Sequence, residues 1–68
     1  MDEDIFNTSV RKFLKKVGIT SQKEIEKIIK EALTNGDIDQ NSICKVSVQL
    51  KMELSDQALI IDGEIHLS

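Results

Sequence analysis

The sequence predicts an α+β fold in which two N-terminal helices pack on one face of a C-terminal antiparallel β-hairpin. Two patterns support this prediction: apolar residues recur at helical spacing as far as about residue 34, and they alternate with polar residues from about residue 43. The third observation is size, since 68 residues allow one small domain, residues 1–68. Folding a chain this short removes only about 60% of its surface from water. We therefore expect one thin core and no deep substrate cavity.

The first helix is expected over residues 4–17. Its apolar residues follow the spacing i, i+4, i+7, i+8, i+11 and form one stripe: Phe6, Val10, Phe13, Leu14 and Val17. Acidic residues at its start and lysines at its end suit the two poles of the helix dipole. Gly18 can adopt the left-handed conformation in which helices commonly end. The sequence therefore predicts a helix end at Gly18.

The second helix is expected over residues 21–34. Ser21 and Glu24 have the spacing of a capping box, in which each side chain accepts a hydrogen bond from a backbone N–H at the helix start. A second apolar stripe follows: Ile25, Ile28, Ile29, Ala32 and Leu33. Asn35-Gly36 is typical of a helix end. With about three residues between them, the two helices should meet in a hairpin or a tight corner.

Strict alternation predicts strands over residues 43–54 and 58–67, joined by a turn at residues 55–58. The residues expected to face inward are Cys44, Val46, Val48, Leu50, Met52 and Leu54 on the first strand, and Leu59, Ile61, Ile65 and Leu67 on the second. A register that pairs Leu54 with Leu59 is favoured, because it also sets Lys51 opposite Asp62 on the outer face.

Asp62-Gly63 leaves a second interpretation open. This dipeptide is a strong signal for a two-residue turn, and a turn there would make residues 58–61 and 64–67 a short hairpin of their own. That hairpin would set apolar residues of one strand beside polar residues of the other. A continuous strand is therefore favoured, with Gly63 as a bulge or as a gap under a helix.

The residues that could carry out chemistry are few. Cys44 and His66 are the only thiol and the only imidazole, so they are the candidates for a nucleophilic pair. Their positions in the alternation place them on opposite faces of the hairpin, so we expect Cys44 to be packed and His66 to be solvated. Asp37–Asn41 matches the first ligands of a calcium loop, but Ser42 replaces the required glycine and Val48 the bidentate glutamate. We expect no enzyme, no cofactor, no metal site and no small-molecule substrate.

The single basic cluster consists of Arg11, Lys12, Lys15 and Lys16. Together with the corner and helix that follow, it permits a helix-turn-helix interpretation in which residues 21–33 enter a DNA major groove. The formal net charge is −3, opposite to the usual charge of a nucleic-acid-binding domain. Nucleic-acid binding is therefore the alternative and not the main hypothesis.

Composition also limits the location of the protein. No apolar run approaches the ~18 residues that a membrane span needs, and no basic-then-apolar segment has the pattern of a secretory signal. A single cysteine fits a reducing compartment. We expect a cytoplasmic protein without a membrane partner.

Four runs of residues carry a family resemblance: Asp4-Ile5-Phe6-Asn7, Ser9-Val10-Arg11-Lys12-Phe13-Leu14-Lys15, Val17-Gly18-Ile19-Thr20-Ser21-Gln22 and Asp62-Gly63-Glu64-Ile65. With these runs the chain resembles a family of small uncharacterised bacterial proteins, found mainly in proteobacteria, that forms a domain of unknown function. The resemblance covers nearly the whole chain, although residues 37–57 match only in pattern. It implies a single-domain bacterial protein and brings no activity, ligand or catalytic residue.

A two-stranded sheet is only marginally stable, and both of its strands are edges. We therefore expect a non-enzymatic interaction module, either a homodimer that completes a larger sheet or a module for another protein partner. Ile60 lies among polar residues on the expected outer face, where a partner could cover it. The alternative is a small nucleic-acid-associated regulator that uses the basic end of the first helix and the helix–helix corner.

Overall fold

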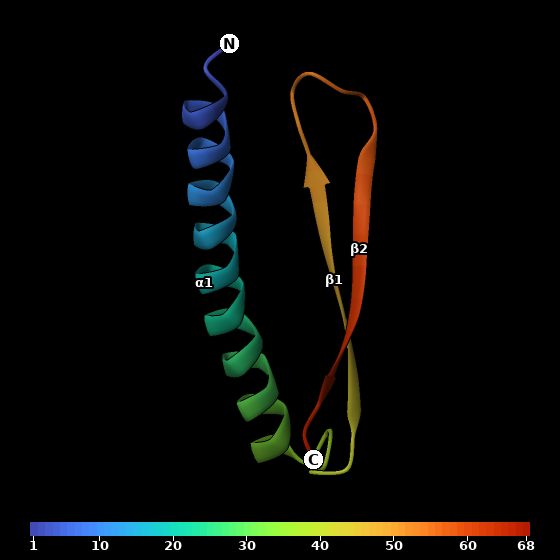
Figure 1. Ribbon diagram of the computed structural model, residues 1–68. Coiled ribbons are helices and arrows are strands. Elements are labelled where there is room, and N and C mark those ends of the chain that lie inside the picture. Colours follow the sequence, from blue (N-terminus) through green and yellow to red (C-terminus); the bar gives the residue numbers. More distant parts are fainter. The chain divides into compact units, whose positions relative to one another are not determined.

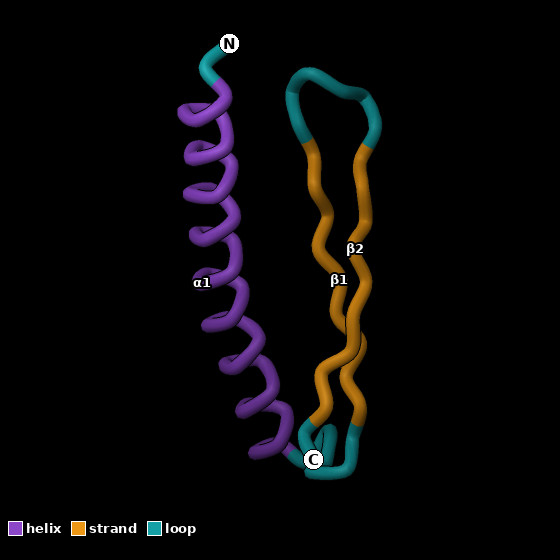
Figure 2. Tube along the Cα trace, in the orientation of Figure 1, coloured by secondary structure: helices purple, strands orange, loops and turns teal.

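A computed structural model describes all 68 residues and contains one helix and two strands (Figure 1). Helix α1 spans Glu3–Asn35, strand β1 spans Ile43–Lys51 and strand β2 spans Ala58–His66 (Figure 2). The α+β class is confirmed. The chain divides into two compact units, Met1–Asp37 with the helix and Ile38–Ser68 with the hairpin.

The two predicted helices are one continuous helix, so the predicted helix end at Gly18 and the corner before Ser21 are wrong. Gly18 lies inside α1, and Gly36 is the only residue with a positive φ. The two apolar stripes are in phase, because Phe6, Val17 and Ile28 recur at intervals of eleven residues. Eleven residues make about three helical turns, so one straight helix keeps both stripes on one side. A glycine in a helix interior costs only about 1 kcal/mol relative to alanine.

Both ends of α1 are capped. The Asp2 carboxylate accepts hydrogen bonds from the backbone N–H of Asp4 at 3.0 Å and of Ile5 at 3.2 Å, which satisfies N–H groups that have no partner within the helix. At the other end Gly36 adopts the left-handed conformation, with φ 77°, and its N–H donates to the Leu33 carbonyl. The helix end predicted at Asn35-Gly36 is confirmed.

The hairpin is a two-stranded antiparallel sheet. Every residue of β1 has a partner in β2, from Ile43 opposite His66 to Lys51 opposite Ala58. The predicted hairpin is confirmed. So is the continuous strand through Asp62-Gly63, and the turn interpretation of that dipeptide is wrong. The pairing passes through Gly63 without a bulge.

The predicted register and the end of the first strand are wrong. Leu50, and not Leu54, lies opposite Leu59, so the register differs from the prediction by four residues. β1 ends at Lys51 and the connection comprises residues 52–57, where the Ser55 N–H donates to the Met52 carbonyl at 3.2 Å. Leu54, expected to face inward, is 91% exposed in this connection.

The observed and the predicted register each place one pair of unlike charges on the outer face. The observed register sets Lys45 directly opposite Glu64 and pairs Val48 with Ile61 on the inner face, whereas the predicted register sets Lys51 opposite Asp62. Directly opposed unlike charges stabilise an antiparallel pair. A shift of four residues leaves every side chain on its original face, so alternation alone could not separate the two registers.

No side chain is fully buried. On α1 the half-buried residues follow one stripe: Val17, Ser21, Ile25, Ile29 and Ala32. On the paired strands they are Cys44, Val46 and Ile65. Large apolar side chains are exposed on both units.

Candidate interaction surface

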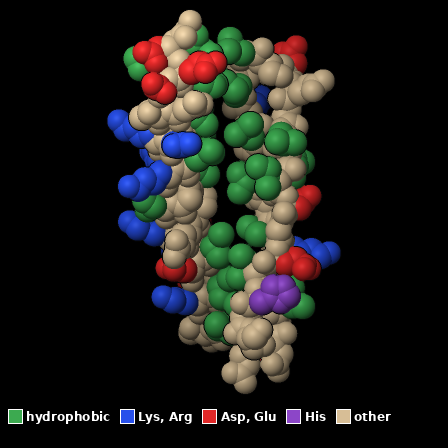
Figure 3. Space-filling view, viewed as in Figure 1, with side chains coloured by type: hydrophobic (Ala, Val, Ile, Leu, Met, Phe, Trp, Pro, Cys, Tyr) green, Lys and Arg blue, Asp and Glu red, His purple; other side chains and the backbone are tan.

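The two faces of the hairpin differ in composition. The inner face carries Cys44, Val46, Val48, Leu50, Leu59, Ile61, Gly63 and Ile65, and the outer face carries Ile43, Lys45, Ser47, Gln49, Lys51, Ala58, Ile60, Asp62, Glu64 and His66. Hydrophobic side chains are visible on the surface of both units (Figure 3). The outer face is thus polar except near its ends and around Ile60.

The first half of β2, Ala58–Ile61, is apolar on both faces. Leu59 and Ile61 point to the inner face and are 58% and 54% exposed, and Ile60 points to the outer face and is 60% exposed. A strand that is solvated on one side normally alternates, whereas continuous apolar runs are typical of strands covered on both faces. Ala58–Ile61 therefore has the composition of an interior strand although it lies at an edge.

Both strands have one free edge, because the sheet contains only β1 and β2. Charged side chains on an edge strand discourage another strand from pairing with it. On β1, Lys45 and Lys51 provide this protection near both ends of the strand. On β2, Asp62 and Glu64 provide it only in the second half. The edge at Ala58–Ile61 carries no charge.

The basic cluster predicted as an interaction surface is exposed on α1. Arg11, Lys12, Lys15 and Lys16 lie in the middle of α1 and not at its end, and its last turn has no basic residue. The predicted match of Lys15 and Lys16 to the C-terminal pole of a helix dipole is therefore wrong. Because α1 is continuous, Lys12 and Lys16 lie on the same side as Lys23, Lys27 and Lys30.

We call these five lysines the lysine face. Figure 3 shows Lys and Arg side chains along one side of α1. The sequence analysis predicted two helices, which placed Lys12 and Lys16 on the first helix and the other three lysines on the second. The signal that could have found it was the spacing of the lysines at three, four and seven residues across Gly18.

Cys44 and His66 do not form a catalytic pair. Cys44 is opposite Ile65 on the inner face and His66 is opposite Ile43 on the outer face, which confirms the predicted separation. Cys44 is a free thiol and is half-buried. The nearest charged partner of His66 is Glu64, with Nε2 3.9 Å from Oε1, and both side chains are more than half exposed. An exposed pair at that distance contributes little.

The acidic connector between α1 and β1 forms a hydrogen-bonded turn. The Asp39 carboxylate accepts from the Asn41 N–H at 2.8 Å, and the Asp39 N–H donates to Ser42 Oγ at 3.0 Å. This is the local pattern by which aspartate stabilises turns. No group of three or more His, Cys, Asp or Glu side chains is arranged to hold a metal ion.

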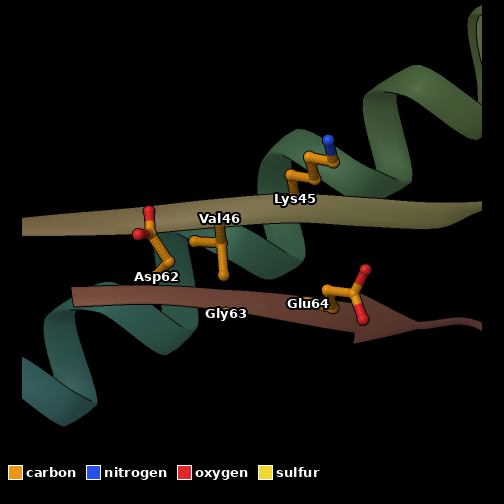
Figure 4. Close-up of a pocket in the computed structure, with 5 residues that line it drawn as sticks. All are labelled: Lys45, Val46, Asp62, Gly63 and Glu64. Carbon is orange, nitrogen blue, oxygen red and sulfur yellow. The ribbon is translucent and has the colours of Figure 1, made fainter.

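A shallow hollow lies on the hairpin beside Gly63, which has no side chain to fill it. Lys45, Val46, Asp62 and Glu64 complete its lining, and their charged groups do not converge on one point (Figure 4). A Cβ atom added at Gly63 would lie 3.5 Å from Val46 Cγ1, an ordinary contact. The hollow therefore has room for a methyl group, and its lining brings no polar groups together at one point.

The family model of DUF6494, a family of unknown function, matches residues 1–68. The chain belongs to DUF6494. This membership confirms the resemblance to a domain of unknown function. A search of curated proteins and a search of solved structures each gave no match. In this DUF6494 member no helix is both long enough and apolar enough to cross a membrane.

Proposed function

We propose that this member of DUF6494 is a non-enzymatic interaction module that works as a homodimer. The observation that carries the proposal is the uncharged, apolar run Ala58–Ile61 on a free edge of a two-stranded sheet. A lone hairpin of two strands is marginally stable in water, whereas a sheet of three or more strands with an apolar face is stable. A second copy supplies the missing strands.

The dimensions of the elements favour two copies. Adjacent strands lie about 4.8 Å apart, so a four-stranded sheet is roughly 19 Å wide. Packed helices lie about 8–10 Å apart, so two α1 helices side by side match that width. In the proposed dimer the apolar stripes of both α1 helices cover the inner faces of the joined hairpins. The predicted packing of helix on hairpin is thus a feature of the proposed dimer. A two-fold axis relates the copies, as in most homodimers.

The alternative of a nucleic-acid-associated regulator has less support. Its helix-turn-helix form required a corner between two helices, and α1 is continuous through that region. The lysine face is a charged surface without that geometry. A different protein partner for Ala58–Ile61 is an outcome of the experiment that follows.

Sedimentation equilibrium over a hundredfold range of concentration tests the proposal, and we expect the mass of two chains. Thermal unfolding over the same range gives a second measurement. A hundredfold increase in concentration stabilises a dimer by RT ln 100, about 2.7 kcal/mol. With about 2.1 cal/mol/K of unfolding entropy per residue, two 68-residue chains should melt about 9 °C higher. The mass of one chain at every concentration, with an unchanged melting temperature, would overturn the proposal.

A further inference from the structure

We propose that the second copy binds at the free edge of β2, so that the two β2 strands run antiparallel with Ile61 opposite its own counterpart. The inference rests on the proposed homodimer and names its contact. The sheet order becomes β1-β2-β2-β1 across the two-fold axis.

The distribution of charge favours β2 over β1 as the edge that is covered. β1 carries Lys45 and Lys51 on its outer face, near the two ends of the strand. In β2 the run Ala58–Ile61 has no charge, and its three large side chains are more than half exposed. Pairing at β2 makes this run an interior strand, the position that suits residues apolar on both faces. The lysine-bearing edges of β1 then remain at the outside of the sheet, where they prevent further strands from adding.

Repulsion between carboxylates selects the register. A two-fold axis at Asp62 would set that carboxylate opposite its counterpart, and an axis at Gly63 would set Asp62 opposite Glu64 twice. Like charges directly opposite each other destabilise a strand pair. An axis at Ile60 pairs only residues 58–62, whereas an axis at Ile61 pairs residues 58–64 and sets no carboxylate directly opposite another, although the two Asp62 side chains become diagonal neighbours. The axis at Ile61 therefore combines the longer ladder with the absence of directly opposed carboxylates.

This register also joins apolar side chains across the new edge. On the inner face Ile61 meets its counterpart directly and Leu59 diagonally, and on the outer face the two Ile60 side chains are diagonal neighbours. Diagonal neighbours in a sheet are close enough for large side chains to touch. The dimer thus covers the exposed residues of β2 on both faces.

The first experiment uses a matched pair of lysine substitutions. Gln49 lies directly opposite Ile60 within the hairpin, on the same face and at the other edge. Ile60→Lys places a charge in the proposed contact, and we expect the dissociation constant of the dimer to rise at least tenfold. Gln49→Lys places the same charge at the free edge of β1 and should leave the dissociation constant unchanged. Circular dichroism of both variants checks that α1 and the hairpin remain folded.

The second experiment uses cross-linking with a short bis-maleimide in a Cys44→Ala background. Ile60→Cys should give a covalent dimer. Ser47→Cys should give no covalent dimer, because Ser47 lies on β1. The two β2 strands lie between the two β1 strands and would hold the two introduced cysteines more than about 14 Å apart.

The outcomes separate this inference from the proposal on which it rests. A dimer by sedimentation that cross-links through Ser47→Cys, or through neither cysteine, overturns the β2 contact and leaves the homodimer in place. Equal weakening by Ile60→Lys and Gln49→Lys overturns the β2 contact as well. A wild-type chain that is a monomer at every concentration overturns both.

Discussion

Gly18→Ala tests whether α1 is continuous. The substitution should raise the free energy of unfolding if residue 18 is helical and lower it if residue 18 is left-handed. Gly18 lies inside the helix, and a Cβ atom added there meets nothing within 4 Å beyond its chain neighbours and the backbone of the helix itself. Alanine therefore fits without a steric clash. If the chain instead turned at Gly18 through the left-handed conformation, alanine would be strained there.

The magnitude follows from the helical environment. Alanine is more favourable than glycine in a helix interior by about 0.8–1.0 kcal/mol, so Gly18→Ala should raise the free energy of unfolding by about 1 kcal/mol. For a chain of this length that change corresponds to roughly 4–8 °C in melting temperature. A left-handed residue at this position would reverse the sign, because alanine pays about 1–2 kcal/mol in that conformation.

Urea unfolding followed by circular dichroism at fixed protein concentration provides the measurement. Gly36→Ala is the matched control, since Gly36 has the same open surroundings but a φ of 77°. It should lower the free energy of unfolding by about 1 kcal/mol. If Gly18→Ala destabilises the protein as Gly36→Ala does, α1 is interrupted and our reasoning about the lysine face fails with it.

Two further predictions concern the thiol and the basic residues. Cys44 is half-buried on the inner face, so it should react slowly with thiol reagents under native conditions, and Cys44→Ala should lower the free energy of unfolding by about 1 kcal/mol. Rapid labelling with no change in stability would contradict this. Because the chain is acidic overall, we expect micromolar protein to bind neither duplex nor single-stranded DNA at about 0.15 M salt. A complex whose affinity falls with a slope near −0.9 per phosphate, and which charge reversal at Lys15 and Lys16 abolishes, would instead support the nucleic-acid alternative.

The alternation of apolar and polar residues was sufficient to predict on which face of the hairpin each strand residue lies. Successive side chains of a strand point to opposite sides, so the position of a residue in the alternation determines its face whatever the partner strand does. That is why Cys44 and His66 were correctly placed on opposite faces and why Ile60 was correctly placed on the outer one. The continuous strand through Asp62-Gly63 followed from the same argument.

Local pattern misled where two signals competed. Gly18 and the Ser21–Glu24 spacing each resemble a helix boundary, and both are also tolerated inside a helix at small cost. The eleven-residue recurrence of Phe6, Val17 and Ile28 is the longer-range signal, and it agrees with the continuous α1 of the structure. The lysine face was missed for the same reason.

The sequence by itself determined the types of the elements, their approximate order and the face of each strand residue, because these depend on neighbours a few positions apart. Only the tertiary structure decided the register of β1 against β2 and the end of β1 at Lys51. Registers that differ by four residues share one alternation, so the choice depends on interactions between residues far apart in the chain. The pairing of Lys45 with Glu64 across the sheet is one such interaction. It exists only once the two strands lie side by side.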